Sequence, residues 1–133
     1  MSIVKIRAAL ETALNNITPA ISTSFENVKF VPVSGTAYQQ VHILFATPNN
    51  SEFGARHKEL GFMQVKLMYP TSVGTASVAA RAELIRSTFA RGSTFTNSGV
   101  NVIISRTPEV KPGKIEADRY EVPVIIEFYA NMN

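Results

Sequence analysis

The stretch TASVAARAELIRSTFARGSTFTNSGVNVII, residues Thr75–Ile104, predicts a helix that leads into a β-hairpin. Its apolar residues recur at spacings of three and four and so share one helix face: Val78, Ala82, Ile85 and Phe89. Arg81 and Arg86 fall off that face, on a side that we expect to be solvated. Thr75 is expected to cap the first free N–H groups with its hydroxyl. Gly92 is expected to close the helix in the left-handed conformation.

After Gly92 the pattern of the chain changes from helical to extended. Ser93–Thr96 is rich in β-forming residues, and Asn97-Ser98-Gly99 has the composition of a turn. From Val100 to Ile104 apolar residues alternate, which is typical of a strand with one buried face. The stretch therefore predicts part of an α/β scaffold and contains no catalytic motif.

The N-terminal half predicts one helix and two strands. Ser2–Ile17 carries an apolar stripe at helical spacing, with Ser2 as a plausible N-cap, and it ends where Thr18 precedes a proline. Phe25–Val31 is a short strand candidate, and Tyr38–Ala46 is a clearer one. In the second strand one face is apolar, whereas His42 and Leu44 point the other way.

Two further strands complete the predicted sheet. Gly61–Tyr69 and Arg119–Ala130 both alternate, and Glu121 and Glu127 are expected on the polar face of the second. Pro123 lacks an N–H and therefore favours an edge position or a bulge. The predicted fold is a single α+β domain over residues 1–133, an antiparallel or mixed sheet flanked by two helices in the order α-β-β-β-α-β-β-β.

Composition narrows the class of protein. The 133 residues suit one domain, and a net charge of +3 without a Lys/Arg block does not support a nucleic-acid footprint. The absence of cysteine excludes disulfides and thiolate metal sites and fits a cytoplasmic protein. The N-terminus lacks the apolar core of a signal peptide, and no apolar run approaches the ~20 residues of a membrane span.

Groups that could do chemistry are few and scattered. His42 lies on a strand and His57 on a predicted loop, and neither has the spacing of a metal motif. The glycines form no phosphate-binding loop, and no serine lies in a nucleophile elbow. Four acidic residues near the C-terminus are better interpreted as surface or strand charges than as a catalytic pair: Glu116, Asp118, Glu121 and Glu127. We therefore expect no catalytic, cofactor-binding or metal-binding residues.

Five blocks of the chain resemble successive blocks of a family of small phage and prophage proteins. They span nearly the whole sequence, from Ser2 to Ala130: MSIVKIRAALETAL, FENVKFVPVSGTAYQQVHILFATPNN, GFMQVKLMYP, ARAELIRSTFARGSTFTNSGVNVIISRTPEV and DRYEVPVIIEFYA. That family is similar to the phage tail terminators, of which the minor tail protein U of lambdoid phages is the familiar type.

The resemblance implies a structural protein of the siphophage virion, not an enzyme, without cofactors. Such proteins form a homo-hexameric ring on the head-proximal end of the tail tube, stop tube polymerisation and offer a surface for head attachment. The implied partners are other copies of the chain, the tail tube protein and head-completion or neck proteins. Neither a membrane nor a specific nucleic-acid sequence is implied, although DNA can pass through the ring. The implied location is the neck of the virion tail, after assembly in the host cytoplasm.

Two polar segments are the sequence-based candidates for the contacts of such a ring, residues 47–60 and residues 106–118. Both are long and lack a core pattern, which is typical of functional or solvated loops. The candidate interface residues are Arg56, His57, Lys58 and Glu59 in the first segment, with Lys111 and Lys114 in the second.

Other functions remain open at the level of sequence. A head–tail joining protein or a tail-tube-like subunit would also lack a catalytic site and form rings. A small enzyme or ligand-binding domain, with a site assembled from scattered residues, is the alternative from another class. A deep pocket that holds His42 and a carboxylate would favour it.

Overall fold

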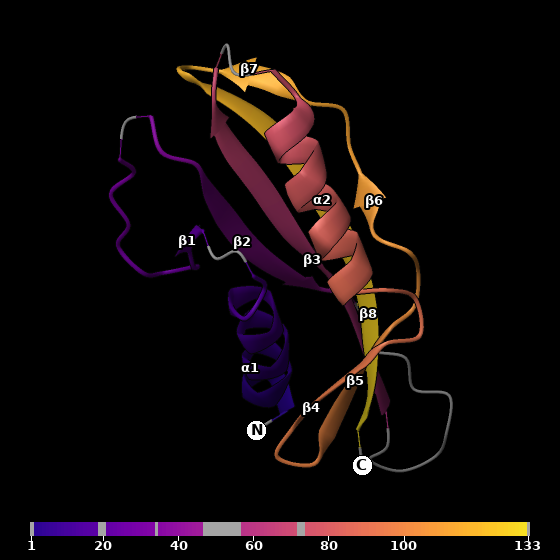
Figure 1. Cartoon of the computed structure of the whole chain (residues 1–133). Helices are drawn as coiled ribbons and strands as arrows, with labels where there is room; N and C mark the ends of the chain where they lie inside the picture. Colours follow the sequence, from indigo (N-terminus) through magenta and orange to yellow (C-terminus); the bar gives the residue numbers. More distant parts are fainter. Residues whose placement is uncertain (1, 19–20, 34, 47–56, 72–73, 133) are drawn as a thin grey trace.

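The structure, a computed structural model, describes residues 2–18, 21–33, 35–46, 57–71 and 74–132 (Figure 1). It is an α+β fold with two helices and a mixed, curled sheet of eight strands. The elements in chain order are α1 (Ser2–Asn15), β1 (Ser22–Ser24), β2 (Tyr38–Phe45), β3 (His57–Pro70), α2 (Ala76–Thr88), β4 (Thr94–Asn97), β5 (Val100–Ile104), β6 (Glu109–Val110), β7 (Lys114–Glu116) and β8 (Arg119–Met132).

The sheet is built around two long neighbouring strands, β3 and β8. The strand order is β1-β2-β3-β8-β5-β4, and the short strands β6 and β7 also pair with β8. All pairs are antiparallel except β1 with β2, which is parallel. β3 and β8 pair over their whole length, from His57 opposite Met132 to Pro70 opposite Arg119. This pair sets the length of the sheet, and every other strand extends one of its sides.

One glycine allows β2 and β3 to stay in close register. Gly61 lies opposite Phe45 on β2 and Phe128 on β8. A Cβ atom at Gly61 would lie 2.3 Å from the backbone oxygen of Leu44 and 3.0 Å from the Phe128 ring. A side chain there would therefore force the two strands apart.

The alternating residues predicted on the strands form one side of a single core. The inward positions of β2, β3 and β8 are buried together with apolar residues of both helices: Val41, Ile43, Met63, Val65, Leu67, Val122, Val124, Ile126 and Phe128 from the strands, and Ile6, Leu10, Leu14, Val78, Ala82 and Ile85 from the helices. Burying each such side chain stabilises the fold by roughly 1.5–3 kcal/mol. Both helices therefore contribute to a core on the same face of the sheet.

The helix in the quoted stretch forms as predicted, but its flank and its ends differ. Arg81 is buried, with 4% of its surface exposed, because it follows Val78 by three positions and lies at the margin of the apolar face. The side chain of Thr75 makes no capping hydrogen bond. Phe89 is the C-cap residue, and its N–H donates to the Ile85 carbonyl. Gly92 does have a left-handed φ of 86°, but its N–H donates to Ile104 of the following hairpin.

The predicted hairpin is confirmed. β4 pairs with β5 from Thr94 opposite Ile103 to Asn97 opposite Val100. The two residues between the strands, Ser98 and Gly99, both have positive φ, 48° and 85°. This is the pattern of the two-residue turns whose twist matches that of a hairpin.

The strand predicted over Tyr38–Ala46 agrees with β2, whereas other predicted strand boundaries were wrong. The first strand is β1, and Phe25–Val31 follows it as turns and irregular chain, so no strand forms there. β3 begins at His57, which places the last four residues of the predicted 47–60 loop in a strand, while residues 47–56 lie outside the described part. The 106–118 segment is not only a connection, because it contains β6 and β7. The chain therefore has five strands after α2 instead of the predicted three.

Pro123 lies in a central strand and not at the predicted edge, but the alternative prediction of a bulge agrees with the register. Val110 pairs with Val124 and Lys114 with Glu121, so two residues of β8 face three residues, 111–113, of the neighbouring segment. The Pro123 carbonyl accepts a hydrogen bond from Lys111 N–H, on the side of β8 that faces β6 and β7. In an antiparallel strand the nitrogen of a residue faces the same side as its carbonyl. The proline nitrogen, which carries no hydrogen, therefore faces residues 111–113, between the two short strands. The bulge thus accommodates the proline within a central strand.

Candidate functional site

In the part of the chain that the structure describes, no three His, Cys, Asp or Glu residues are close enough together to hold a metal ion. His42 is exposed on β2, and Glu121 is a buried carboxylate that lies 3.4 Å from the ammonium of Lys66. None of the described helices is long and apolar enough to cross a membrane. The surfaces through which the chain can contact other proteins are therefore the candidate functional sites.

Two of the four candidate interface residues of the first polar segment, Lys58 and Glu59, lie in a strand and not at a loop tip. Arg56 and the side chain of His57 lie outside the described residues. Lys58 and Glu59 belong to β3, opposite Asn131 and Ala130 of β8. The ammonium of Lys58 lies 4.8 Å from the centre of the Tyr129 ring, and Glu59 is buried. Both side chains thus have contacts within the sheet.

The candidate residues of the second segment lie at the other end of β8. We call residues 106–118 the arm. Lys111 and Lys114 are exposed on it and pair with Glu109 at 3.2 Å and Glu116 at 3.5 Å. Lys114 lies opposite Glu121, ten positions from the partner of Lys58, which is roughly 33 Å along a strand. Lys58 and Lys114 are therefore not brought together on one surface.

The structure instead exposes apolar side chains in a segment that the sequence predicted to be a strand. Residues 27–33, which we call the valine loop, connect the end of β1 towards β2 and include NVKFVPV. Val28, Val31 and Val33 are 61%, 72% and 65% exposed, and Lys29 is the one charged residue of the loop. In Figure 1 this part of the chain extends away from the sheet beyond β1 and β2. Three of the seven residues of the valine loop therefore expose apolar side chains to solvent.

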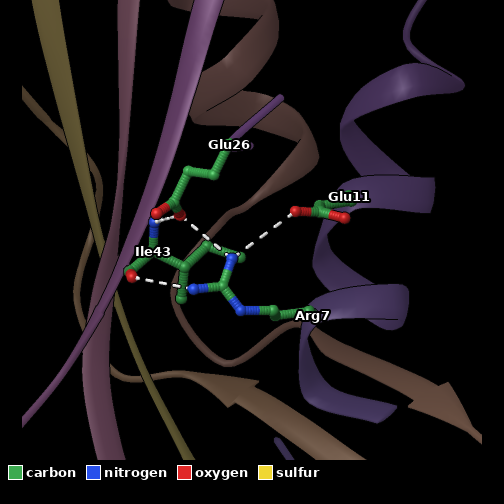
Figure 2. Close-up of polar contacts among 4 residues, drawn as sticks. All are labelled: Arg7, Glu11, Glu26 and Ile43. Carbon is green, nitrogen blue, oxygen red and sulfur yellow. Dashed lines mark hydrogen bonds and ion pairs between the residues drawn. The ribbon is translucent and has the colours of Figure 1, made fainter. Parts of the chain in front are cut away.

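The first end of the valine loop is fixed by the carboxylate of the preceding residue, Glu26, which binds the edge of β2 (Figure 2). One oxygen of Glu26, Oε1, accepts hydrogen bonds from Ile43 N–H at 2.7 Å and from Arg7 Nη1 at 2.9 Å. Arg7 Nη2 in turn donates to the Ile43 carbonyl at 3.4 Å. Glu26 and Arg7 therefore satisfy both backbone groups of Ile43, as a neighbouring strand would do.

The ionisation of this cluster follows from its contacts. Burial alone would raise the pKa of Glu26, but the Ile43 N–H and the Arg7 guanidinium outweigh it, so the pKa lies below the usual value. Glu11 lies 3.8 Å from Arg7, and burial raises the pKa of its carboxyl despite that neighbour. Glu26 is thus the carboxylate that the cluster holds ionised.

The second end of the valine loop is fixed by an arginine of β8. Arg119 is 6% exposed, and its guanidinium donates to the carbonyls of Val33, at 2.7 Å, and Thr36. The same guanidinium lies 5.0 Å from the centre of the Tyr38 ring, which in turn contacts Phe30. The valine loop is therefore held at one end by the carboxylate of the residue before it, Glu26, and at the other end by Arg119 of β8, while its valines are exposed.

Comparison with known proteins identifies the family. A model of the phage tail terminator protein family matches residues 5–128. The chain belongs to this family. It is a family of structural proteins, not of enzymes, and it makes the chain a component of phage tails. The family predicted from the quoted sequence blocks is thereby confirmed.

Comparison with solved structures supports the fold. One solved structure matches with a TM-score of 0.81 at 22% sequence identity, over 100% of this chain and 97% of the other. At this identity the match supports the fold alone. A search of the curated proteins finds no match.

The sequence contains a signal for the valine loop but none for the two residues that anchor it. Glu26 and Arg119 are single charges beside apolar residues, and nothing in their spacing indicates that they meet the backbone of a distant segment. The valines of the valine loop have strand propensity, which pointed to a buried strand. Pro32 and the missing alternation of polar and apolar residues in the sequence are the features that could have indicated a surface loop.

Proposed function

We propose that this protein is a tail terminator that closes into a ring, with six copies as the family resemblance implies. The ring caps the head-proximal end of the tail tube, stops its polymerisation and provides the surface to which the head attaches. Its partners are other copies of the chain, the tail tube protein and the head-completion or neck proteins. It acts in the neck region of the virion tail.

The observation that carries the proposal is the family match, which extends over residues 5–128. The physical features of the chain support an assembly role. A ring consists of contacts in which one patch of a subunit meets a different patch of the next. The valine loop offers exposed apolar side chains for such contacts, and no three His, Cys, Asp or Glu residues in the described part of the chain are grouped to hold a metal ion.

The proposal is tested by deleting the gene from the phage and measuring tail lengths by electron microscopy. A terminator is needed to stop tube growth, so we expect tails longer than those of the wild type, and a normal length distribution after complementation. Tails of normal length that do not attach to heads would instead identify a head–tail joining protein. Absence of tube would identify a tube subunit.

A further inference from the structure

The contact of Glu26 and Arg7 with Ile43 lies at an edge of the sheet that β1 covers only in part. β1 pairs with β2 over residues 38–40 and no further. The other side of β2 pairs with β3 over the whole length of the strand. Among the described residues, no strand continues the cover of β1 along the rest of this edge. The segment Val41–Phe45 is therefore an edge whose outward backbone groups need partners other than a strand.

The sequence of β2 is one that would pair readily with a second copy of itself. The eight residues YQQVHILF contain no Asp, Glu, Lys, Arg, Gly or Pro. Uncharged, β-forming segments without proline are the ones that stack into cross-β assemblies when an edge exposes them. Edge strands often carry a lysine or a proline that prevents such pairing, and β2 carries neither. Left unprotected, this edge would favour association between copies of the chain.

Glu26 and Arg7 occupy the place where a longer β1 would lie (Figure 2). β1 ends at Ser24, opposite Gln40, so a longer strand would run past Ile43 three residues later. The chain turns instead, and side chains take over the pairing. The Glu26 carboxylate accepts the Ile43 N–H, and the Arg7 guanidinium donates to the Ile43 carbonyl. These are the two groups through which a strand would pair with this position of β2.

We propose that Glu26 and Arg7 form a guard at this edge, which prevents β2 from pairing with the β2 edge of a second copy. The two side chains come from different elements, the turn after β1 and α1, and an ion pair of 2.9 Å joins them. An incoming strand would have to displace both from Ile43 before it could form its own hydrogen bonds there. The guard acts within each chain, so it does not depend on the ring contacts of a terminator.

Removal of the carboxylate tests the guard. Glu26→Ala leaves the Ile43 N–H available to another chain. The variant should form assemblies faster than wild type by about tenfold or more, because a free edge of this composition is a template for cross-β pairing. Light scattering measures the rate, and thioflavin T fluorescence reports the stacked strands. Glu26→Gln keeps an oxygen that can accept the same hydrogen bond and should stay close to wild type. Equal rates for wild type and Glu26→Ala would overturn the proposal.

Arg119→Ala separates the guard from a general loss of stability. This variant removes the two hydrogen bonds at the other end of the valine loop and leaves the Ile43 contacts in place. Its loss of stability should be at least as large as that of Glu26→Ala, since both hydrogen bonds come from a charged donor. Under conditions in which both variants are folded, Arg119→Ala should nevertheless assemble more slowly. Equal rates for the two variants would show that destabilised chains, and not the open edge, form the assemblies.

A lysine on the edge strand tests whether β2 is the strand that pairs. Leu44 is 49% exposed, so Leu44→Lys adds a charge to β2 without removing a core side chain. In the Glu26→Ala chain it should suppress assembly, because like charges on two facing edges repel each other. Ser87→Lys is the matched control, since it adds the same charge on the exposed side of α2, and it should leave assembly of Glu26→Ala unchanged. If both lysines had the same effect, β2 would not be the associating edge and the guard would be refuted.

Discussion

The valine loop and the arm both connect strands of the same sheet, but backbone pairing holds only the arm. β6 and β7 of the arm pair with β8, and one side chain from another element, Arg86 of α2, adds a hydrogen bond to the Pro108 carbonyl. The valine loop contains no strand and is held by two charged side chains, that of the preceding residue Glu26 and that of Arg119 from β8.

This difference determines which side chains matter in each segment. Backbone pairing survives most substitutions, since every residue except proline carries the same N–H and C=O groups. A segment held by two side chains depends on those two residues. Equivalent substitutions in the two regions should therefore have unequal effects, and the following predictions test this expectation.

The largest difference in stability is expected between alanine variants of two arginines, Arg119 at the valine loop and Arg106 in the arm. Arg119→Ala removes both hydrogen bonds to the base of the valine loop, and it should lower the free energy of unfolding by about 3 kcal/mol, because hydrogen bonds from charged donors are the strong ones. Arg106→Ala in the arm removes an exposed ion pair with Glu127 at 3.5 Å and should cost less than about 0.5 kcal/mol. Urea unfolding of both variants measures the difference.

Arg119→Lys is the control for charge. Lysine keeps the positive charge but cannot donate to the Val33 and Thr36 carbonyls with the fork of a guanidinium, so an intermediate loss is expected. Equal losses for Arg119→Ala and Arg106→Ala would show that the valine loop does not depend on its anchor.

A smaller difference in stability is expected between alanine variants of two glutamates, Glu26 at the valine loop and Glu116 in the arm. Glu26→Ala leaves the Ile43 N–H without its acceptor and should cost about 2 kcal/mol. Glu116→Ala in the arm removes an exposed pair with Lys114 and should cost about 0.3 kcal/mol. Similar melting temperatures for the two variants would contradict the role of Glu26 as an anchor.

The Glu26 effect should depend on pH. The pKa of Glu26 is lower in the folded protein than its usual value of 4.5, so its carboxylate stabilises the fold above that pH. This contribution is lost as the pH falls through the folded-state pKa, and the gap between wild type and Glu26→Ala should narrow there. The pKa of Glu11 is raised, and its protonation acts in the opposite direction, so both proteins are compared in a Glu11→Gln background. A gap that stays constant in acid would rule out the ion pair as its source.

The fold was largely predictable because alternation and helical spacing are local signals. The quoted stretch gave α2 and the β4–β5 hairpin, and the alternating runs gave β2, β3 and β8. The short strands β6 and β7 could not be predicted, since their residues are exposed and polar and pair only because β8 passes beside them. The predicted exposure of Arg81 was wrong, because the burial of a residue at the margin of a helix face depends on which residues lie near it in space.

The candidate site was less predictable, for a physical reason. The sequence pattern predicts polar residues at the contact surface and apolar residues in the core, whereas the structure buries Glu59 and exposes the valines of the valine loop. The exposure of Val31 depends on the position in which Glu26 and Arg119 hold the valine loop. The hydrogen bonds of these two residues join parts of the chain that are distant in the sequence. Local patterns carry no information about such contacts, whereas the family could be identified from the whole sequence.

The smallest expected effect concerns the backbone of the two segments. Ala117 in the turn between β7 and β8 has a φ of 54°, and Asn27 in the valine loop has a φ of 58°. Alanine is strained in this region, whereas asparagine tolerates it. Ala117→Gly should therefore raise the free energy of unfolding by about 0.5–1 kcal/mol, since relief of strain outweighs the greater freedom of glycine in the unfolded chain. Asn27→Gly lacks that relief and should leave stability unchanged or lower it by about 0.5 kcal/mol. Chemical denaturation of both variants provides the measurement, and a stabilisation by Asn27→Gly as large as that by Ala117→Gly would show that strain is shared by both segments.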